Sequence, residues 1–433
     1  MKVHFIGIGG IGLSALARFL NYDGHEVSGS DMKSSPITLE LEKEGIKVSS
    51  PQDSKNISDD FDLVIYSAAV TDENPELIEA RLKQIRTLSR KEALPIVLGD
   101  KKNFCVAGAH GKSTTTAILA SIMQSSALIG AISKDFGSNF RYVNDLVCFE
   151  ADESDASFLL SNPYCSIVTN AEPEHMEYYH YDYEKFYEAY RKFIELGTKK
   201  VLNGEDEHIQ KLNIKDADFL YPSCDIKNLS YLLKDGEPCT KFDLKDFGSF
   251  EVWGFGYHIA VDASLAILAA LNELDVETIR KNITCYKGIK KRFDLVQKED
   301  NFALIDDYAH HPTEIEATMK SVELYDNLTN INKRVVIWQP HKYSRTNDNL
   351  EGFKRCFRRC DELIILPIWT IPGEQVIEID FEKEFAQYNP TFADKLNTSK
   401  GKVELVKDGK IIKTIDSGII LGVGAGDITY QLR

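Results

Sequence analysis

The chain lacks three features that mark membrane, zinc-binding and nucleic-acid-binding proteins. No apolar run approaches the ~20 residues that a membrane-spanning helix needs, and Arg18 and several glycines interrupt the apolar segment 1–20, so we expect no signal peptide. The eight cysteines form no CxxC pair, which argues against a zinc site and favours reduced thiols. Positive charge is scarce, since 51 Lys and Arg stand against 67 Asp and Glu, a net charge of −16. That balance argues against a nucleic-acid or anionic-membrane partner but does not exclude small anions.

What the chain does contain is an alternation of strand-like and helical segments along 433 residues, a length that predicts two or three domains. Hydrophobic residues make up 43% and charged residues 27%, which is ordinary for a soluble protein, and we expect a cytoplasmic one. Apolar runs that end in glycines or acids predict parallel α/β sheets. We place three α/β units at residues 1–98, 99–290 and 291–433, with a linker over 94–102.

The pattern of apolar residues gives the expected elements. We expect strands at 3–8, 27–30, 63–67, 103–107, 146–149, 166–169, 201–203, 302–305, 335–339, 362–366 and 419–423. We expect helices at 13–20, 113–123 and 260–271. The segment 212–252 is less regular and is expected to form an appended antiparallel region.

A glycine-rich turn follows the first expected strand and opens a helix. Its sequence from Gly7 to Gly12, GIGGIG, fits GxGxxG, and Asp31 ends the second strand about 20 residues later. Glycines let the backbone approach a pyrophosphate, and a helix N-terminus favours the anion. The turn alone is typical of an NAD site, with a ligand-free helix-packing turn as the alternative. We expect a pyrophosphate here and leave the nucleotide open.

The strongest local signal is a second turn, residues 107–114 with the sequence AGAHGKST. A Gly-Lys-Ser triplet between a strand and a helix supplies backbone amides, a lysine charge and a hydroxyl for Mg²⁺. The loop is a shortened variant of GxxxxGK[ST], because Val106 occupies the first glycine position. It predicts a phosphate-binding loop.

Acidic residues follow the next strand of the same unit, where residues 149–155 read FEADESD. Carboxylates at the carboxyl end of a strand beside a phosphate loop are placed to hold Mg²⁺, and the alternative is a solvated acidic loop. The segment TNAEPEH at 169–175 ends the following strand in the same register. Its His175 is either a ligand of a second metal or an ordinary loop histidine.

Three polar clusters mark the last unit. The basic run 290–292 begins it, and an Arg there can clamp a phosphate, although such runs are usually solvated. The segments DDYAHHPT at 306–313 and QPHKYSR at 339–345 each follow a strand, where open α/β sheets bind ligands. The adjacent His310 and His311 have no obvious third ligand, so we expect no zinc there.

Taken together and in this order, the motifs resemble those of the Mur ligases of peptidoglycan synthesis, over essentially the whole chain. They are GIGGIG, SGSD, GAHGKSTTT, EADESDASF, TNAEPEH, KKRFD, DDYAHHPTE and QPHKYSRT. The resemblance implies a Rossmann-like N-terminal domain, a central P-loop ATPase-type parallel sheet and a C-terminal Rossmann-like α/β domain. It implies an ATP- and Mg²⁺-dependent ligase of the alanine-adding branch, which joins L-alanine to the lactyl carboxylate of UDP-N-acetylmuramate through an acyl phosphate. We expect a monomer or weak homodimer.

The resemblance also implies roles for individual residues. The first turn would hold UDP rather than NAD, with expected contacts at Gly9, Gly10, Gly12, Asp31, Ser67 and Arg90. The expected ATP contacts are Gly108, Ala109, His110, Gly111, Lys112, Ser113, Thr114, His258, Arg292 and Asp307. The expected metal ligands are Ser113, Glu150 and His175. The residues expected to meet the alanine or the acyl phosphate are Tyr308, His310, Lys342 and Arg345. The catalytic set is Lys112, Glu150, His175, Arg292, His310, His341 and Arg345, with His310 and His341 as candidate bases.

The chain departs from the family pattern at three places. Tyr190 stands where several Mur ligases carry a carbamylated lysine, and the alanine-adding branch also lacks that lysine. The usual His-Asn-x-x-Asn beside the adenine begins at His258 but carries Ile259 and Asp262, which puts adenine recognition in doubt. Lys342 replaces an Arg, which keeps the charge but loses the bidentate fork.

Three alternatives stay open on the sequence alone. A recycling ligase that joins a tripeptide to the same UDP-sugar would have nearly the same loops. An NAD-dependent oxidoreductase with a P-loop regulatory domain would explain the first turn, although EADESD and DDYAHHPTE speak against it. A non-catalytic nucleotide-binding scaffold is opposed by the intact Lys112, Glu150 and His175.

Overall fold

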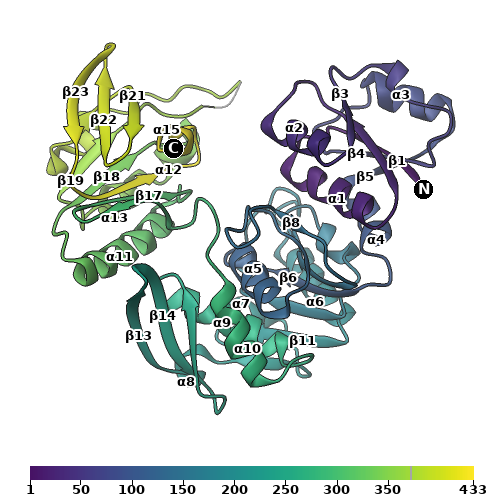
Figure 1. Cartoon of the computed structure of the whole chain (residues 1–433), viewed down its shortest axis with the longest axis horizontal. Coiled ribbons are helices and arrows are strands. Elements are labelled where there is room, and N and C mark those ends of the chain that lie inside the picture. Colours follow the sequence, from purple (N-terminus) through teal and green to yellow (C-terminus); the bar gives the residue numbers. More distant parts are fainter. Residues whose placement is uncertain (371–372) are drawn as a thin grey trace. The chain divides into compact units, whose positions relative to one another are not determined.

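The structure is a computed structural model that describes residues 1–370 and 373–433. The chain forms two compact units. The first comprises Met1–Asn228, Phe242–Val252 and Ala260–Lys287, and the second comprises Leu229–Lys241, Trp253–Ile259 and Gly288–Arg433. The predicted α/β class is confirmed, because the large sheets are mainly parallel (Figure 1). Within the described ranges, no helix combines the length and the apolar character required to cross a bilayer.

The first sheet of the first unit has the order β3-β2-β1-β4-β5 and is parallel throughout. Its strands are β1 (Lys2–Ile6), β2 (Glu26–Ser30), β3 (Lys47–Ser49), β4 (Leu63–Tyr66) and β5 (Arg86–Ser89). The helices are α1 (Ile11–Tyr22), α2 (Pro36–Lys43), α3 (Pro75–Leu82) and α4 (Arg90–Leu98). The neighbours of β1 are β2 and β4, so the loop after β1 lies where the strand order reverses, the usual ligand position of such sheets.

The second sheet of this unit has the order β12-β11-β10-β6-β9-β7-β8, parallel except between β7 and β8. Its strands are β6 (Lys102–Ala107), β7 (Ser126–Leu128), β8 (Phe140–Arg141), β9 (Leu146–Glu150), β10 (Cys165–Val168), β11 (Lys199–Asn203) and β12 (Asp218–Leu220). The helices are α5 (Lys112–Met123), α6 (Tyr183–Leu196), α7 (Glu207–Lys211), α8 (Pro222–Asp225), α9 (Tyr257–Ala270) and α10 (Val276–Asn282). Because β6 lies between β10 and β9, the second glycine turn also occupies a switch point.

A separate three-stranded sheet fills most of the segment expected to be an appended region. Its strands are β13 (Ile226–Lys234), β14 (Glu237–Leu244) and β15 (Ser249–Trp253). Asp235 and Gly236 join β13 to β14 with φ angles of 55° and 77°. Two consecutive positive φ angles are typical of a tight antiparallel hairpin, as predicted for this region.

The second unit contains a six-stranded sheet of order β16-β17-β24-β18-β19-β20, in which only β16 runs antiparallel to its neighbour. Its strands are β16 (Asp294–Glu299), β17 (Phe302–Asp307), β18 (Arg334–Trp338), β19 (Glu362–Ile365), β20 (Thr391–Phe392) and β24 (Gly418–Val423). A small antiparallel sheet that we did not expect consists of β21 (Lys395–Ser399), β22 (Lys402–Lys407) and β23 (Lys410–Ile415). The helices are α11 (Pro312–Thr329), α12 (Tyr343–Asp348), α13 (Leu350–Cys356), α14 (Phe381–Glu384) and α15 (Ile428–Gln431).

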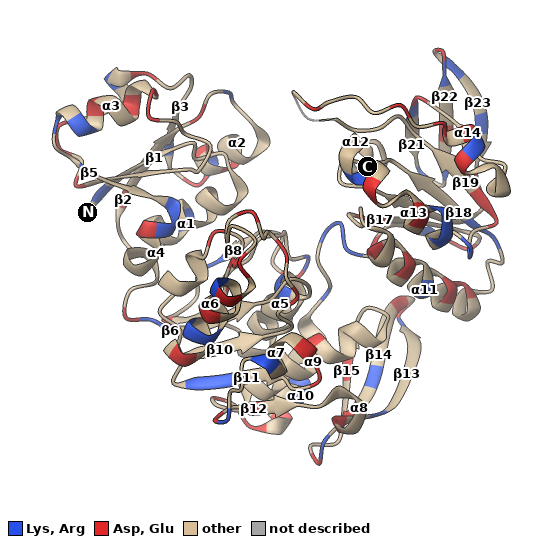
Figure 2. Cartoon of the chain, turned by 180° about the vertical axis from the view of Figure 1, so that it is seen from behind, with Lys and Arg blue, Asp and Glu red and all other residues tan. Residues whose placement is uncertain are grey.

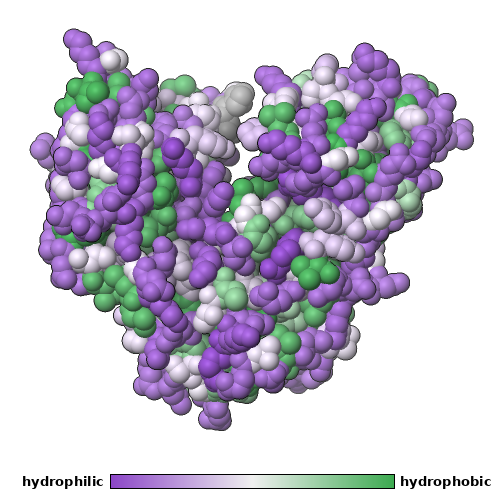
Figure 3. All heavy atoms as spheres, in the orientation of Figure 1, coloured by the Kyte–Doolittle hydropathy of each residue, from purple (hydrophilic) through white to green (hydrophobic). Residues whose placement is uncertain are grey.

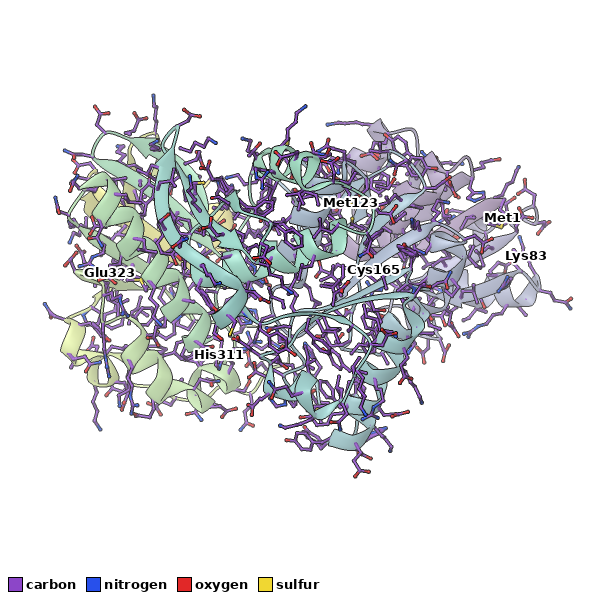
Figure 4. All side chains as sticks on the ribbon, turned by 90° about the horizontal axis from the view of Figure 1, so that it is seen from below. Met1, Lys83, Met123, Cys165, His311 and Glu323 are labelled. Atoms are coloured by element: carbon purple, nitrogen blue, oxygen red, sulfur yellow. The ribbon has the colours of Figure 1, made fainter. Side chains whose placement is uncertain are left out.

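Helix α11 shows how the surface of this unit is built. His311, labelled in Figure 4, is its N-cap residue, and Glu323 lies in its second half. The charged residues of the helix are mainly acidic, with Lys320 among them, as the red and blue segments of Figure 2 show. Hydrophilic residues dominate the molecular face drawn in Figure 3. The apolar face of α11 packs on the sheet through buried residues such as Ile315 and Met319. The excess negative charge of the chain is thus spread over solvated surface.

The expected linker over 94–102 is wrong in its first half, because α4 continues to Leu98. Ser89 and Glu92 form a capping box that fixes the start of this helix. Its buried face, which includes Leu94 and Val97, anchors it in the core. These contacts outweigh the hydrogen bond that Pro95 is unable to donate.

Candidate active site

The first glycine turn leads into the N-terminus of α1 and is partly exposed to solvent. Gly10 is the exposed N-cap residue of α1, so the first amides of the helix face solvent and can receive an anion. Behind it, the Gly9 amide donates a 2.8 Å hydrogen bond to Oδ2 of Asp31. The Asp31 carboxylate therefore already accepts a hydrogen bond from the backbone of the glycine turn.

Two further predicted residues lie against the same turn. A Cβ added at Gly12 would lie 2.7 Å from Nη1 of Arg90, and one at Gly7 would lie 2.9 Å from Oγ of Ser67. The other end of the guanidinium faces Asp152, with Nη2 of Arg90 3.7 Å from Oδ2. The structure therefore brings Arg90 and Ser67 to the first turn. Their contact with UDP stays a prediction.

Glycines are required at two positions of the second turn. Gly108 has a φ of 142°, and a Cβ there would collide with Oγ1 of Thr169. Gly111 has a φ of 81°, and its Cβ would lie 2.5 Å from Oδ1 of Asp262. The loop is thus packed too tightly for side chains at these points, which leaves its backbone free to approach a phosphate.

Asn170 braces the middle of this loop. Its amide nitrogen donates to the His110 carbonyl at 2.9 Å, and its amide oxygen accepts from the His110 backbone N–H at 3.2 Å. The exposed His110 ring points elsewhere, with Nε2 3.4 Å from Glu174 and 3.5 Å from Glu172. The backbone of His110 is therefore fixed, while its side chain is available to solvent.

Lys112 and Ser113 begin helix α5 and contact two different acids. Oγ of Ser113 donates to Oε1 of Glu150 at 2.9 Å, and Nζ of Lys112 lies 2.9 Å from Oε1 of Glu153. Glu150 ends β9, and its other oxygen accepts from the Gly130 amide at 2.7 Å. The sequence predicted the pairing of Ser113 with Glu150 through a metal, and the structure places the two oxygens side by side.

His175 is not joined to this pair. It is exposed and has a φ of 51°. The hydrogen bonds that Ser113 and Glu150 form among the described residues do not include its ring. The described part of the chain contains no group of three His, Cys, Asp or Glu arranged to hold a metal ion. A metal at Ser113 and Glu150 would therefore complete its coordination with phosphate oxygens or water, and the role of His175 stays a prediction.

Asp262 is the residue of the altered His-Asn-x-x-Asn motif that reaches the loop. It is 6% exposed, and burial raises its pKa to about 8. At neutral pH the side chain is mostly a neutral acid beneath Gly111, which makes it a close substitute for an amide. Ile259 is buried against Gly254, and His258 is exposed at the start of α9.

In the second unit, Asp307 is engaged by its own surroundings. It is buried at the end of β17 and accepts hydrogen bonds from the Phe293 amide at 2.9 Å, the Ala309 amide at 2.8 Å and the Thr318 hydroxyl at 3.1 Å. Burial raises its pKa, although nearby Arg292 opposes this effect. The carboxylate thus organises the loop after Arg292, and its contact with ATP stays a prediction.

The two candidate bases differ in their hydrogen bonds. Nδ1 of His310 lies 3.0 Å from the Tyr308 carbonyl, so it carries the proton and leaves Nε2 as an acceptor. Nδ1 of His341 accepts from Nη1 of Arg345 at 3.0 Å. Burial, followed by the Arg345 charge, lowers the pKa of His341 to about 4, and burial also lowers the pKa of His310. Both rings are neutral at pH 7.

The remaining predicted residues of this unit lie around the same loops. Arg292 is exposed, with its guanidinium carbon 5.9 Å from the centre of the Tyr308 ring. Lys342 is the N-cap residue of α12, with a φ of 66°, and its amide donates to the Trp369 carbonyl at 2.9 Å. The positive φ marks a strained backbone, a feature that recurs at functional loops.

Sequence reasoning missed the specific roles of Glu153, Asn170 and Glu314. Glu314 accepts from the backbone amides of His310 and His311 at 3.0 and 3.2 Å, which completes a capping box at the start of α11. Its signal was present, because Glu lies three residues after the N-cap position. No local signal exists for Glu153 or Asn170, since their partners are 41 and 60 residues away.

Comparison with known proteins agrees with the motif order. Residues 2–102 match the family described as "Mur ligase family, catalytic domain", and residues 291–412 match "Mur ligase, glutamate ligase domain". A UDP-N-acetylmuramate–L-alanine ligase of Campylobacter curvus is 54% identical, covering 100% of this chain and 99% of the relative. One of Helicobacter pylori is 51% identical, with coverage of 100% and 96%. The crystal structure of a UDP-N-acetylmuramate–alanine ligase from Thermotoga maritima matches with a TM-score of 0.79 at 26% identity, covering 100% of this chain and 97% of that one. The predicted relationship is thereby confirmed: the chain belongs to the Mur ligase family.

Proposed function

We propose that the chain is an ATP-dependent ligase that joins L-alanine to the lactyl carboxylate of UDP-N-acetylmuramate. The full-length relatives that are 51–54% identical carry this activity in their names. The observation that carries the proposal is the arrangement of Lys112 and of Ser113 with Glu150 around a glycine loop at a sheet switch point. The family assignment leaves the oxidoreductase and scaffold alternatives without support.

Mg²⁺ fits the donors at the second turn. The Ser113 hydroxyl and the Glu150 carboxylate are hard oxygen donors 2.9 Å apart, the chemistry that Mg²⁺ prefers beside phosphate oxygens. When bound, the ion would neutralise negative charge on the triphosphate. We propose His175 for a second ion, on the strength of the resemblance alone.

The reaction requires one anion to attack another. A lactyl carboxylate oxygen forms a bond to the γ-phosphorus of ATP, the bond to the β,γ-bridging oxygen breaks, and ADP leaves. Lys112 supplies positive charge at the start of α5, where the helix N-terminus adds to it. The alanine nitrogen then attacks the acyl carbon, and inorganic phosphate leaves with the electrons of the C–O bond. No protein nucleophile is needed, because positioning and electrostatics lower the barrier.

The amine must lose a proton before or during its attack. Of the two candidates, we propose His310 as the base, because Nε2 is its free acceptor, whereas Nδ1 of His341 is occupied by Arg345. A neutral imidazole near pH 7 suits this role. We propose Arg345, Lys342 and Tyr308 for the alanine carboxylate and the acyl phosphate.

We also propose that the function divides over three domains, residues 1–98, 99–290 and 291–433. Each contains one of the large sheets, which lie within 2–89, 102–220 and 294–423. The first would bind UDP through the turn at Gly9–Gly12 with Asp31, Ser67 and Arg90. The second would bind ATP, and the third the amino acid.

Phosphate release with UDP-N-acetylmuramate, ATP and Mg²⁺ tests the proposal across a panel of amino acids and against the tripeptide L-Ala-γ-D-Glu-meso-diaminopimelate. We expect L-alanine to give the highest kcat/KM. Preference for the tripeptide would favour the recycling alternative, and absence of sugar-dependent turnover with every acceptor would refute the ligase.

A further inference from the structure

Lys112, the lysine of the phosphate loop, has no free hydrogen-bond donor in this conformation. Its ammonium group carries three N–H donors. They are directed to the carbonyl oxygens of Gly108 and Ala109 and to Oε1 of Glu153, the last at 2.9 Å. The side chain is therefore folded back onto its own loop.

Glu153 is built into the core behind this lysine. Its side chain is 2% exposed, against 16% for that of Lys112. Its backbone carbonyl accepts from the Tyr179 hydroxyl and from the Ala156 amide, so the position of the residue is fixed by the chain around it. A carboxylate this deeply buried is costly unless a cation pairs with it, which makes Lys112 its necessary partner.

Within the described part of the chain, the second carboxylate oxygen of Glu153 has no polar partner that could replace the lysine. Oε2 is buried without a hydrogen-bond partner among the described residues, and so is the hydroxyl of Tyr190. Burial, and next the charge of Glu153, raises the pKa of Tyr190, which places the two groups within electrostatic range. Without Lys112, Glu153 would have no cation to compensate it, since the other charged group acting on it is the like-charged Asp152.

We propose that Glu153 is a positioning residue that holds Lys112 in a resting conformation and that nucleotide phosphates must take the ammonium group away from it. The inference rests on the proposed function, in which Lys112 binds the ATP phosphates. The ion pair compensates a largely buried lysine while no nucleotide is bound. It also competes with the phosphates for the same donors, so it lowers the affinity for the triphosphate.

Nucleotide binding without turnover tests the exchange. We would measure the Kd of AMP-PNP with Mg²⁺ and of adenosine for the full chain, its Glu153→Gln variant and the matched control Asp145→Asn, which removes an exposed charge just before β9. We expect Glu153→Gln to bind AMP-PNP about 5-fold to 20-fold more tightly and adenosine unchanged, and the control to match the wild type. A purely structural role would lower stability without a phosphate-dependent gain. Unchanged or weaker AMP-PNP binding by a folded Glu153→Gln variant would overturn the inference.

A crystal structure of the wild type with AMP-PNP and Mg²⁺ gives a second test that needs no variant. We expect Nζ of Lys112 to contact a phosphate oxygen. Its distance from the Glu153 carboxylate should then exceed about 4 Å, the limit for an ion pair. Retention of the 2.9 Å contact with phosphate bound would overturn the inference and leave the proposed function intact. Failure of the wild type to bind AMP-PNP at all would overturn both.

Discussion

Two buried carboxyl groups with opposite environments lie behind the phosphate loop. Glu153 has the cation of Lys112 beside it, whereas Asp262 lies beneath Gly111, where burial raises its pKa to about 8. Burial raises the pKa of both groups, but the charge of Lys112 opposes this effect at Glu153, whereas no cation among the described residues acts on Asp262. The charge behind the loop is thus set by single residues that the loop motif itself does not contain.

Asp262→Asn should change how stability depends on pH. Because the pKa of Asp262 is raised, the folded protein holds a proton that the unfolded chain releases, so the free energy of unfolding of the wild type falls as pH rises from about 4 to about 8. Asn cannot titrate, so the variant should gain roughly 2–4 kcal/mol over the wild type at pH 7 and nothing near pH 4. Urea denaturation at both pH values measures the difference. A variant that is less stable at pH 7 would show that the carboxylate is needed in its charged form.

Ser113→Ala should weaken the binding of Mg²⁺ at the proposed metal site. The variant loses one oxygen donor next to Glu150, so we expect the Mg²⁺ concentration for half-maximal turnover to rise about tenfold. Ser113→Thr keeps the hydroxyl and should restore the wild-type value. Equal Mg²⁺ titrations for all three proteins would remove Ser113 from the metal site.

At the scale of elements, the loop before α5 depends on the strand next to it. Asn170 follows β10 and fixes the backbone of His110 by two hydrogen bonds. The sheet therefore positions the phosphate loop from outside the loop sequence. The same principle holds in the second unit, where Asp307 at the end of β17 accepts from the amide of Phe293, the residue after Arg292.

Asn170→Ala should loosen the loop while the fold persists. The two lost hydrogen bonds contribute about 1 kcal/mol each, so we expect the KM for ATP to rise by up to about thirtyfold. The KM for the UDP-sugar should change little, because its proposed contacts lie at the other glycine turn. Steady-state kinetics with each substrate varied in turn would separate the two. An equal rise in both KM values would indicate general loss of structure.

The central strands of the large sheets could be predicted from the sequence, because buried parallel strands are continuous apolar runs whose ends are marked by glycines or acids. Of the helices, α1, α5 and α9 were expected and the others were missed, as were edge strands such as β3 and β12. The expected strand at 302–305 is β17 (Phe302–Asp307), and the expected helix at 113–123 is α5 (Lys112–Met123). The small sheet β21–β23 was missed because its strands mix apolar residues with lysines and other polar residues and so contain no continuous apolar run. The turn between β22 and β23, Asp408-Gly409, was its one readable signal.

Contacts of the site between residues of recognised motifs could be predicted. Contacts that depend on the arrangement of the strands could not. The pairing of Ser113 with Glu150 was expected from two motifs. The contacts of Glu153 and Asn170 depend on which strands become neighbours in the sheet, which local sequence does not specify.

At the scale of the whole molecule, the two steps of the proposed reaction fall on different units. The residues proposed for phosphoryl transfer, Lys112, Ser113 and Glu150, belong to the first unit. Those proposed for the amine, His310 and Arg345, belong to the second. Variants in one unit should therefore separate the two chemical steps.

Arg345→Ala should block the amide step and spare the phosphoryl step. The variant loses a cation proposed for the alanine carboxylate, so we expect kcat/KM for alanine to fall by about 10²–10³-fold. Sugar-dependent formation of the acyl phosphate without alanine should stay within about threefold of the wild type. Rapid-quench assays of ADP formed per enzyme measure this step, and a parallel loss of both steps would contradict the division.

The most direct test of the account is to trap the acyl phosphate with Lys112→Ala. Wild type, UDP-N-acetylmuramate, ATP and Mg²⁺ are mixed without alanine, and borohydride reduces any acyl phosphate to an alcohol that mass spectrometry detects. We predict the alcohol with the wild type and its loss, by at least about 10³-fold, with the variant. Near-normal trapping and sugar-dependent ADP release by Lys112→Ala would contradict the central claim that this lysine carries phosphoryl transfer.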